Sequence, residues 1–430
     1  MRFGVAIGVT AIALVGAGPS TASQRYAAPN GTGPPATCPQ ANPCNLIDAV
    51  EGPAAVDGDE VLLAQGTYVL PENLDVIDDV TISPVDPAGG KPVLTAAAGT
   101  SDVVDVRGAP GALLSDLEIR ATSADQSGIG LSSGAAQRLA VSSVGAGACL
   151  VFSAPVLSPV VLRDSTCVDS AGGPGLSVLS DEPSDIASIA LAGVTGVSSG
   201  SGALLPRPFG LYVAATDTSA TASVTADNVI ATGSGANADI RAEVTGGATS
   251  ASVDLESSNF DLVSQSGASV TAPGSGTNQM APPLFADLAT GNAHQATGSP
   301  TINAGASGFL YFGDLDVDRD PRTIGPAPDI GGDEFVPDTT APDTELTKQP
   351  KKKVKSKKKR KKAKFAFSST EPGSTFTCSL DGGPAKTCDA GTFVKKVKRG
   401  KHTFEVAATD AAGNTDATPA EYRWKLKRKR

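Results

Sequence analysis

Three aspartates at alternate positions, Asp314, Asp316 and Asp318, are the residues best suited to holding a metal ion. Ca²⁺ prefers clustered carboxylate oxygens, so these three are the candidate metal ligands and Ca²⁺ is the candidate cofactor. An EF-hand is excluded, because Arg319 stands where that loop requires glycine. We therefore favour a structural role, in which the aspartates cap turns and pair with Arg319 or Arg322.

Catalysis would require other sets of residues. Two carboxylate pairs have the spacing to lie close together: Asp102 with Asp105, and Asp164 with Asp169. The arginines that could act as the base of a lyase are Arg107, Arg120, Arg138 and Arg163. The two histidines, His294 and His402, have no serine and aspartate pattern around them and are expected to be structural. No catalytic residue is assigned, and the sequence leans towards a protein that is not an enzyme.

The first residues are typical of an export signal. Arg2 precedes an apolar run from Phe3 to Val15, and the small residues Ser20, Thr21 and Ala22 suit cleavage. The run is short for a membrane span, and no second apolar segment follows it. We predict a signal peptide over residues 1–22, a secreted or cell-surface location, and no transmembrane segment once the signal is removed.

The six cysteines favour disulfides, because an even number in an exported chain forms bridges and neither a CxxC pair nor a companion histidine indicates zinc. Their spacing favours three pairs: Cys38 with Cys44, Cys149 with Cys167, and Cys378 with Cys388.

Charge divides the chain into two parts. Residues 23–347 hold 10 Lys and Arg against 38 Asp and Glu, whereas residues 348–430 hold 24 against 7. Such an asymmetry indicates both a domain boundary and an interaction with a charged partner.

A lysine-rich run marks the boundary. Like charges along such a run repel one another, so we predict an extended, solvated linker over residues 337–363. The run is either a spacer or a site for an anionic polymer, and nucleic acid is disfavoured because no aromatic residues interleave with the lysines. The candidate polyanion-binding residues are Lys351, Lys352, Lys353, Lys355, Lys357, Lys358, Lys359, Arg360, Lys361 and Lys362.

Short apolar strands recur through the acidic part. One series begins at residues 128, 148, 175 and 210, in steps of 20, 27 and 35 residues. A second series of apolar strands alternates with the first along the chain, at residues 139–141, 160–162, 186–191, 224–230 and 253–255. Steps of this length with alternating apolar residues are typical of a parallel β-helix, whose stacked coils share one buried interior.

Two stretches of sequence resemble one protein family. The opening CNLIDAV, GDEVLL and GTYVL (residues 44–70) and the later GSPTINAG and DIGGDEF (residues 298–335) resemble the bacterial secreted choice-of-anchor Q, or pectate-lyase-like, proteins. The resemblance implies a right-handed parallel β-helix over residues 23–336 and a short cap helix begun by Asn45. It also implies that residues 294–335 close the last coil. Lyases and glycoside hydrolases occur on such folds, so an enzyme has to be considered.

Residues 364–430 alternate apolar and polar side chains and predict a small β-sandwich. The segments FTCSLDGG, KHTFEVAATDAAGNTD and YRW resemble bacterial immunoglobulin-like modules, which implies a basic immunoglobulin-like β-sandwich with Trp424 in its core. The predicted chain is therefore all-β.

These features favour a non-enzymatic, secreted or cell-surface β-helix protein that serves adhesion or carbohydrate contact. Its basic tail would bind an anionic cell-envelope polymer or polysaccharide. The alternative is a polysaccharide lyase or glycoside hydrolase that uses a cleft of the β-helix. A third interpretation is mutual neutralisation of the acidic and basic parts. The sequence names no particular ligand and no oligomeric state.

Overall fold

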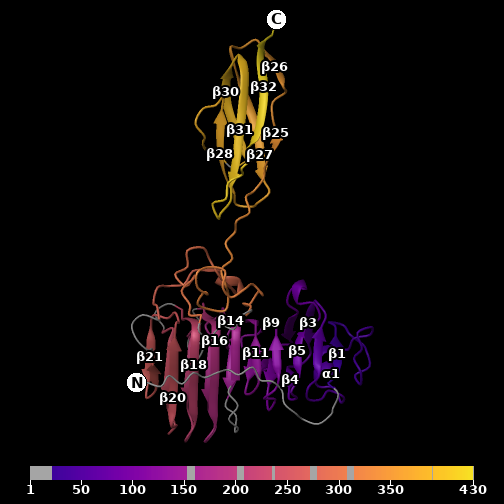
Figure 1. Ribbon diagram of the computed structural model, residues 1–430, viewed down its shortest axis with the longest axis vertical. Coiled ribbons are helices and arrows are strands. Elements are labelled where there is room, and N and C mark those ends of the chain that lie inside the picture. The colour runs from indigo at the N-terminus through magenta and orange to yellow at the C-terminus, as the bar shows by residue number, and fades with distance from the viewer. Residues whose placement is uncertain are drawn as a thin grey trace. The chain divides into compact units, whose positions relative to one another are not determined.

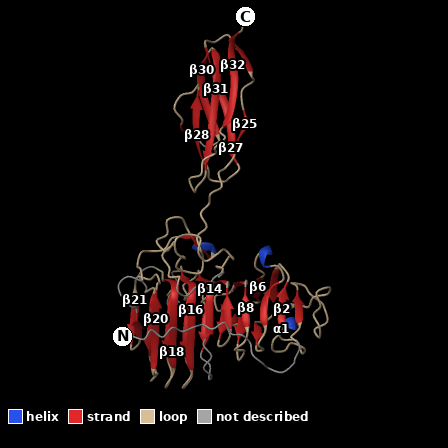
Figure 2. Ribbon diagram, viewed as in Figure 1, coloured by secondary structure: helices blue, strands red, loops and turns tan. Residues whose placement is uncertain are grey.

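The computed structural model describes residues 22–152, 160–200, 208–234, 238–271, 278–307, 314–389 and 391–429. The predicted signal peptide lies outside these residues, except for Ala22. The chain divides into two compact units, Met1–Phe335 and Val336–Arg430, each built mainly from strands (Figures 1 and 2). Among the described residues, no helix has the length and apolar character needed to cross a membrane.

The first unit is a right-handed parallel β-helix, in which each coil contributes strands to two parallel sheets. In early coils, sheet A has two short strands per coil: β1 Gln24–Ala27, β2 Glu60–Leu63, β5 Thr81–Pro84, β8 Leu113–Ser115 and β11 Ala135–Gln137 on one side, and β3 Thr67–Leu70, β6 Val93–Ala96, β9 Glu118–Arg120 and β12 Ala140–Ser143 on the other. In later coils the two sides merge into long strands, followed by a short last one: β14 Val160–Asp169, β16 Ile186–Ser198, β18 Thr221–Thr232, β20 Ser250–Glu256 and β22 Ser269–Thr271. Sheet B has one strand per coil: β4 Leu74–Val76, β7 Asp102–Val106, β10 Ser127–Leu131, β13 Cys149–Phe152, β15 Leu176–Ser180, β17 Leu211–Ala215, β19 Ile240–Val244 and β21 Val263–Ser266.

The repeat predicted from the sequence is the register of sheet B. Ile129 pairs with Cys149, Cys149 with Leu176, and Leu176 with Leu211. All four side chains are at most 1% exposed, because they point into the interior that the stacked coils share. The predicted fold class is confirmed.

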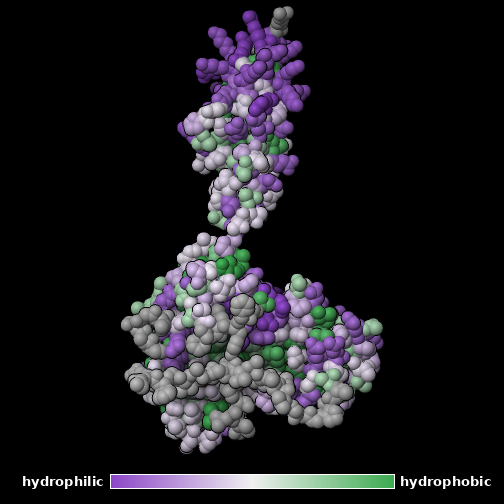
Figure 3. All heavy atoms as spheres, viewed as in Figure 1, coloured by the Kyte–Doolittle hydropathy of each residue, from purple (hydrophilic) through white to green (hydrophobic). Residues whose placement is uncertain are grey.

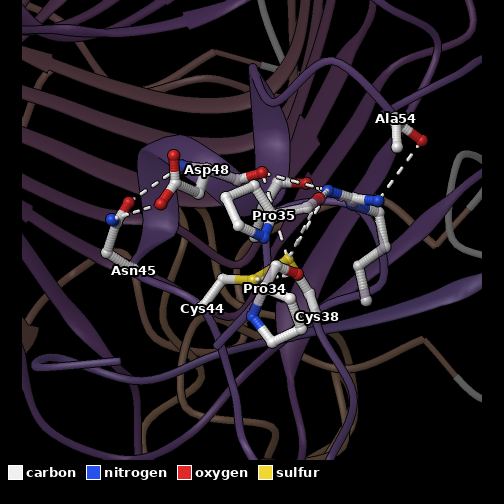
Figure 4. Close-up of a disulfide and its surroundings, with 9 residues drawn as sticks. Pro34, Pro35, Cys38, Cys44, Asn45, Asp48 and Ala54 are labelled. Atoms are coloured by element: carbon white, nitrogen blue, oxygen red, sulfur yellow. Dashed lines mark hydrogen bonds between the residues drawn. A yellow bond between two sulfur atoms is a disulfide. The ribbon is translucent and has the colours of Figure 1, made fainter. Parts of the chain in front are cut away.

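A short helix, α1 Leu46–Val50, lies at the first coil. Asn45 is its N-cap and accepts a hydrogen bond from the backbone N–H of Asp48, as predicted (Figure 4). Arg25 of β1 is only 1% exposed, and its guanidinium donates to the carbonyl oxygens of Ala49 and Asp48 at the end of this helix. These bonds fix the helix to the first strand.

The three predicted disulfides are all present. They join Cys38 to Cys44, Cys149 to Cys167, and Cys378 to Cys388. The first lies beside α1 (Figure 4), and the second links β13 of sheet B to β14 of sheet A across the interior.

Sheet A bends sharply along a row of residues in the left-handed conformation, which we call the bend row. Strand register places its members on successive coils: Asp116, Arg138, Asp164, Gly193, Asn228 and Ser257, with φ between +47° and +61°. This conformation disfavours most side chains but is tolerated by Gly, Asn and Asp, which supply four of the six members. The row therefore presents polar groups along one edge of the β-helix.

Residues 285–307 and 314–335, the returning segment, pack along that edge. The segment contains β23 Phe285–Asp287, η2 Leu288–Thr290 and β24 Asn292–Gln295. Its backbone N–H of Gly331 donates to the carbonyl of Asn228, and Asn228 also exchanges two hydrogen bonds with Ala306. In Figure 1 it is the orange chain along the ends of β14 and β16. The expectation that residues 294–335 close the last coil is wrong, because these contacts reach back to coils formed much earlier in the chain.

The second unit is a two-sheet β-sandwich, here called the tail domain. One sheet contains β25 Thr344–Lys348, β27 Arg360–Ser369 and β30 Thr392–Lys398. The other contains β26 Lys353–Ser356, β32 Ala420–Arg428, β31 Gly400–Thr409, β28 Thr375–Leu380 and β29 Lys386–Cys388. The rings of Phe365 and Phe404 stack between the sheets with centroids 4.1 Å apart, and Trp424 is 4% exposed.

The linker predicted over residues 337–363 is not the arrangement found. Strands β25 and β26 and the start of β27 lie within it. Alternation explains the difference: Val354 and Ala363 turn towards the space between the sheets, while the lysines on either side of each face solvent. A solvated lysine face is compatible with a strand when the opposite face is apolar.

Candidate functional site

The three aspartates proposed as calcium ligands do not converge. Asp314 forms an ion pair with Arg163 at 2.7 Å. Asp316 is fully buried and accepts backbone hydrogen bonds from Asp318, Asp320 and Glu334. Its carboxylate therefore holds a turn together, as the structural interpretation expected, and the predicted three-aspartate calcium site is not formed.

The nearby arginines contact partners other than those expected. Arg319 pairs with Asp116 at 2.9 Å, and Arg322 pairs with Asp164 at 3.4 Å. Both aspartates belong to the bend row, so the arginines join the returning segment to the coils rather than to neighbouring aspartates. Arg138 also pairs with Asp116, at 2.8 Å.

Asp318 belongs to a second group, with His294 and Lys91. Lys91 donates to the carbonyl oxygen of Val317 and lies 3.6 Å from the Asp318 carboxylate. His294 places Nε2 against Asp318 and Nδ1 against the side-chain oxygen of Asn292. These side chains line part of a hollow of about 370 Å³ between the returning segment and sheet A. Each of these groups already has a partner within the protein. We therefore interpret them as contacts that hold the returning segment against sheet A.

The pair formed with Asp318 raises the pKa of His294 above its usual value, and Asp333 adds to the effect, while burial and Lys91 oppose it. A raised folded pKa means that the protonated ring stabilises the fold at pH below about 6.5 and that this contribution is lost as pH rises through the folded pKa. We expect NMR titration of the two histidines to give His294 a midpoint above about 6.5, and Asp318→Asn to lower it. A midpoint at or below that of a free histidine in the unchanged protein would contradict the assignment.

An acidic group lies on the outward face of sheet B. Arg107 lies 3.1 Å from Asp105 and 2.9 Å from Asp75, and burial raises the pKa of Asp105 to about 6. Burial also raises the pKa of Asp102. A carboxyl group with a pKa near neutrality can exchange protons with a substrate, so this group has the residue types for acid–base chemistry.

An aromatic side chain that could stack on a sugar, that of Tyr212, is far from that group. Tyr212 donates to Glu243 and stacks on Phe209 at 5.7 Å. Strand register separates Tyr212 from Asp105 by four strand spacings, about 19 Å. The acidic group and the aromatic pair therefore do not form one cleft.

The other proposed catalytic residues have structural contacts. Asp169 accepts hydrogen bonds from Ser143 and from the backbone N–H groups of Gly145, Gly172 and Gly173. Arg120 pairs with Glu118 on the surface of β9. His402 contacts Asp381 and the carbonyl of Lys398 inside the tail domain. None of these contacts favours a catalytic role.

The tail domain carries the densest charge. All ten proposed polyanion-binding residues are exposed, on β26, on β27 and beside them. The fold adds further cations that sequence reasoning missed: Lys395, Lys396, Lys398, Arg399, Lys401, Lys425, Lys427 and Arg428. Figure 3 shows strongly hydrophilic residues gathered at the end of the tail domain that carries the C-terminus. The signal for the missed residues was their alternation with Val397, Trp424 and Leu426.

Cations stand directly opposite one another in this region. Lys353 pairs in register with Lys425, and Lys355 with Lys427. On the other sheet, Arg360 faces Lys398 and Lys362 faces Lys396. Like charges directly opposite on adjacent strands destabilise a sheet. Across residues 337–429 as described, the ion pairs join Arg423 to Glu421 and His402 to Asp381, and none reaches these lysines. We call these eighteen exposed lysines and arginines of the tail domain, the ten proposed from the sequence and the eight added by the fold, the basic end.

Comparisons with known proteins give no family. No family model matches the chain, and no curated protein matches it. Among solved structures, the chain is similar to pectate lyase Pel9A, with 14% identity over 74% of this chain and 97% of that chain and a TM-score of 0.30. It is also similar to a pectin methylesterase from Aspergillus niger, with 11% identity over 64% of this chain and 95% of that chain and a TM-score of 0.28. Neither likeness bears on the chemistry of this chain.

Proposed function

We propose that this chain is an extracellular β-helix protein without enzymatic activity, held by its basic end to an anionic polymer of a cell envelope or matrix. The β-helix would then present a long surface for adhesion or carbohydrate contact. The narrower proposal, a choice-of-anchor Q protein with an immunoglobulin-like tail, rests on the sequence motifs at the two ends of the β-helix and in the tail.

The observation that carries the proposal is the facing of like charges at the basic end. Cross-strand lysine pairs weaken the sheet that contains them, so they need a compensating partner. A polymer with closely spaced phosphate, sulfate or carboxylate groups supplies it, since each anion can lie between two ammonium groups. The three disulfides support an oxidising compartment such as the extracellular space.

Binding of the full chain to immobilised polyphosphate tests the proposal. Release of counterions makes such binding strongly salt-dependent. With about five lysines engaged, we expect the affinity to fall by about 10²–10³ between 50 and 200 mM salt. Neutral dextran should not bind. Binding that is insensitive to salt, or equal binding to dextran, would remove the basis of the proposal.

A further inference from the structure

A groove opens in the tail domain between β26 and β27, which belong to different sheets and do not pair with each other. Its volume is about 370 Å³, within the range of sites that enclose small ligands. No hydrogen-bonded strand pair closes this edge of the sandwich, and the residues beneath it are 2–5% exposed apart from the half-buried Val354.

The floor of the groove is apolar. It is formed by Val354, Ala363, Val397, Trp424 and Leu426, which are the inward residues of both sheets. Trp424 also packs against Phe365, with ring centroids 5.2 Å apart. Apart from the indole N–H of Trp424, this surface is hydrocarbon, and it favours an aliphatic chain.

The rim of the groove is cationic. Lys351, Lys353, Lys355, Lys361 and Lys362 line it, and no carboxylate does. The long stems of lysines can lie along apolar surface while their ammonium groups reach solvent. The groove thus combines an aliphatic interior with a positive mouth.

We propose that this groove binds an anionic amphiphile, with its aliphatic chain along the apolar floor and its phosphate, sulfate or carboxylate head group against the rim lysines. The charge of the rim matches the head group, and the apolar floor matches the chain. The inference deepens the proposed function, because it makes the anionic partner of the basic end one that carries an alkyl chain.

Trp424 is the single tryptophan of the chain and lies in the floor, so its fluorescence reports on the groove. The full-length protein is titrated with hexyl, octyl and decyl phosphate, each below its micelle concentration. We expect a change in Trp424 emission and about threefold to fourfold tighter binding for each added methylene until the groove is full. Inorganic phosphate tests the head group alone, and octyl glucoside tests the chain alone. Both are expected to bind at least tenfold more weakly than octyl phosphate.

Two valines provide matched variants. Val354 lines the groove, whereas Val394 of β30 is 50% exposed and does not. We expect Val354→Ser to weaken octyl phosphate about tenfold and Val394→Ser to leave it unchanged, with polyphosphate binding intact in both. Denaturant unfolding followed by Trp424 fluorescence checks that each variant is folded.

The inference is overturned if octyl phosphate binds no more tightly than inorganic phosphate, or if Trp424 emission is unchanged at saturation. Polyphosphate binding by the same protein would then leave the proposed function standing. Loss of polyphosphate binding in the unchanged protein would remove the proposed function instead, whatever the alkyl phosphates do.

Discussion

Replacing Lys353, Lys355 and Lys427 by glutamine is expected to weaken binding to polyphosphate about 10²-fold and to stabilise the tail domain. The first effect follows because a lysine close to an anionic surface contributes about 1 kcal/mol, so three contribute about 3 kcal/mol. The second follows because the variant removes the like-charge repulsion within the facing pairs Lys353–Lys425 and Lys355–Lys427. Each relieved pair adds about 0.2–1 kcal/mol to the free energy of unfolding. Denaturant unfolding followed by Trp424 fluorescence reports on the tail domain alone, since the chain has one tryptophan.

The matched control removes three lysines that face uncharged residues. Lys348, Lys364 and Lys386 pair in register with Ala366, Val394 and Cys378. Their replacement by glutamine removes the same total charge, but it should change the unfolding free energy by no more than about 0.5 kcal/mol and weaken polyphosphate by less than about tenfold. Equal losses of affinity in the two variants would show that net charge, rather than the basic end, governs binding. An unchanged stability of the first variant would show that the facing lysines do not repel.

The strands of the β-helix could be predicted because each coil repeats the same local requirement. Ile129, Cys149, Leu176 and Leu211 must all be apolar to line one interior, so their spacing is visible in the sequence. The disulfides followed from the same short spacings. The fold class therefore depended on information that lies close together in the chain.

The returning segment could not be placed in this way. Its contacts join Lys91 to Val317, Arg163 to Asp314 and Asn228 to Ala306, residues separated by 226, 151 and 78 positions. No periodicity links such partners, and a charged side chain in a loop is equally compatible with a metal, a turn or a distant ion pair. The aspartates of residues 314–318 were consequently grouped by their nearness in sequence, whereas the structure separates their partners.

The prediction of a linker from the lysine-rich run was wrong for a different reason. Charge alone indicated a solvated linker, but Val354 and Ala363 supply the inward apolar side chains of β26 and of the start of β27. The alternation was present in the sequence and was outweighed by the density of lysines. Strand pairing determines which lysines face one another, so the facing pairs of the basic end could not be predicted without these strands.

Replacing Arg322 by glutamine is expected to release the returning segment at a cost of about 3 kcal/mol, because losing one partner of a buried ion pair is strongly destabilising and Asp164 then keeps only its ion pair with Arg163, at 3.6 Å. Arg322 and Asp164 expose only 2% and 3% of their side chains, and Arg322 also donates to the carbonyl of Asp329. Hydrogen exchange at Gly331 and Gly332 measures the docking, since their N–H groups donate to Asn228 and Thr195. We expect their protection to fall about 100-fold, whereas Arg120→Gln, in an exposed pair with Glu118, should leave it nearly unchanged.

The cost should depend on pH and on the partner. Burial raises the pKa of Asp164 to about 6 even with Arg322 beside it, so Asp164 is mainly protonated at pH 5 and mainly ionised at pH 7.5. Loss of Arg322 should therefore weaken docking more at pH 7.5 than at pH 5. The double variant Arg322→Gln with Asp164→Asn should recover most of the protection, because both partners of the buried pair are then uncharged and asparagine already occupies the equivalent left-handed position at Asn228. If protection at Gly331 and Gly332 were as low in the double variant as in Arg322→Gln alone, the guanidinium would act through its shape and its bond to Asp329. Its charge would then not hold the segment.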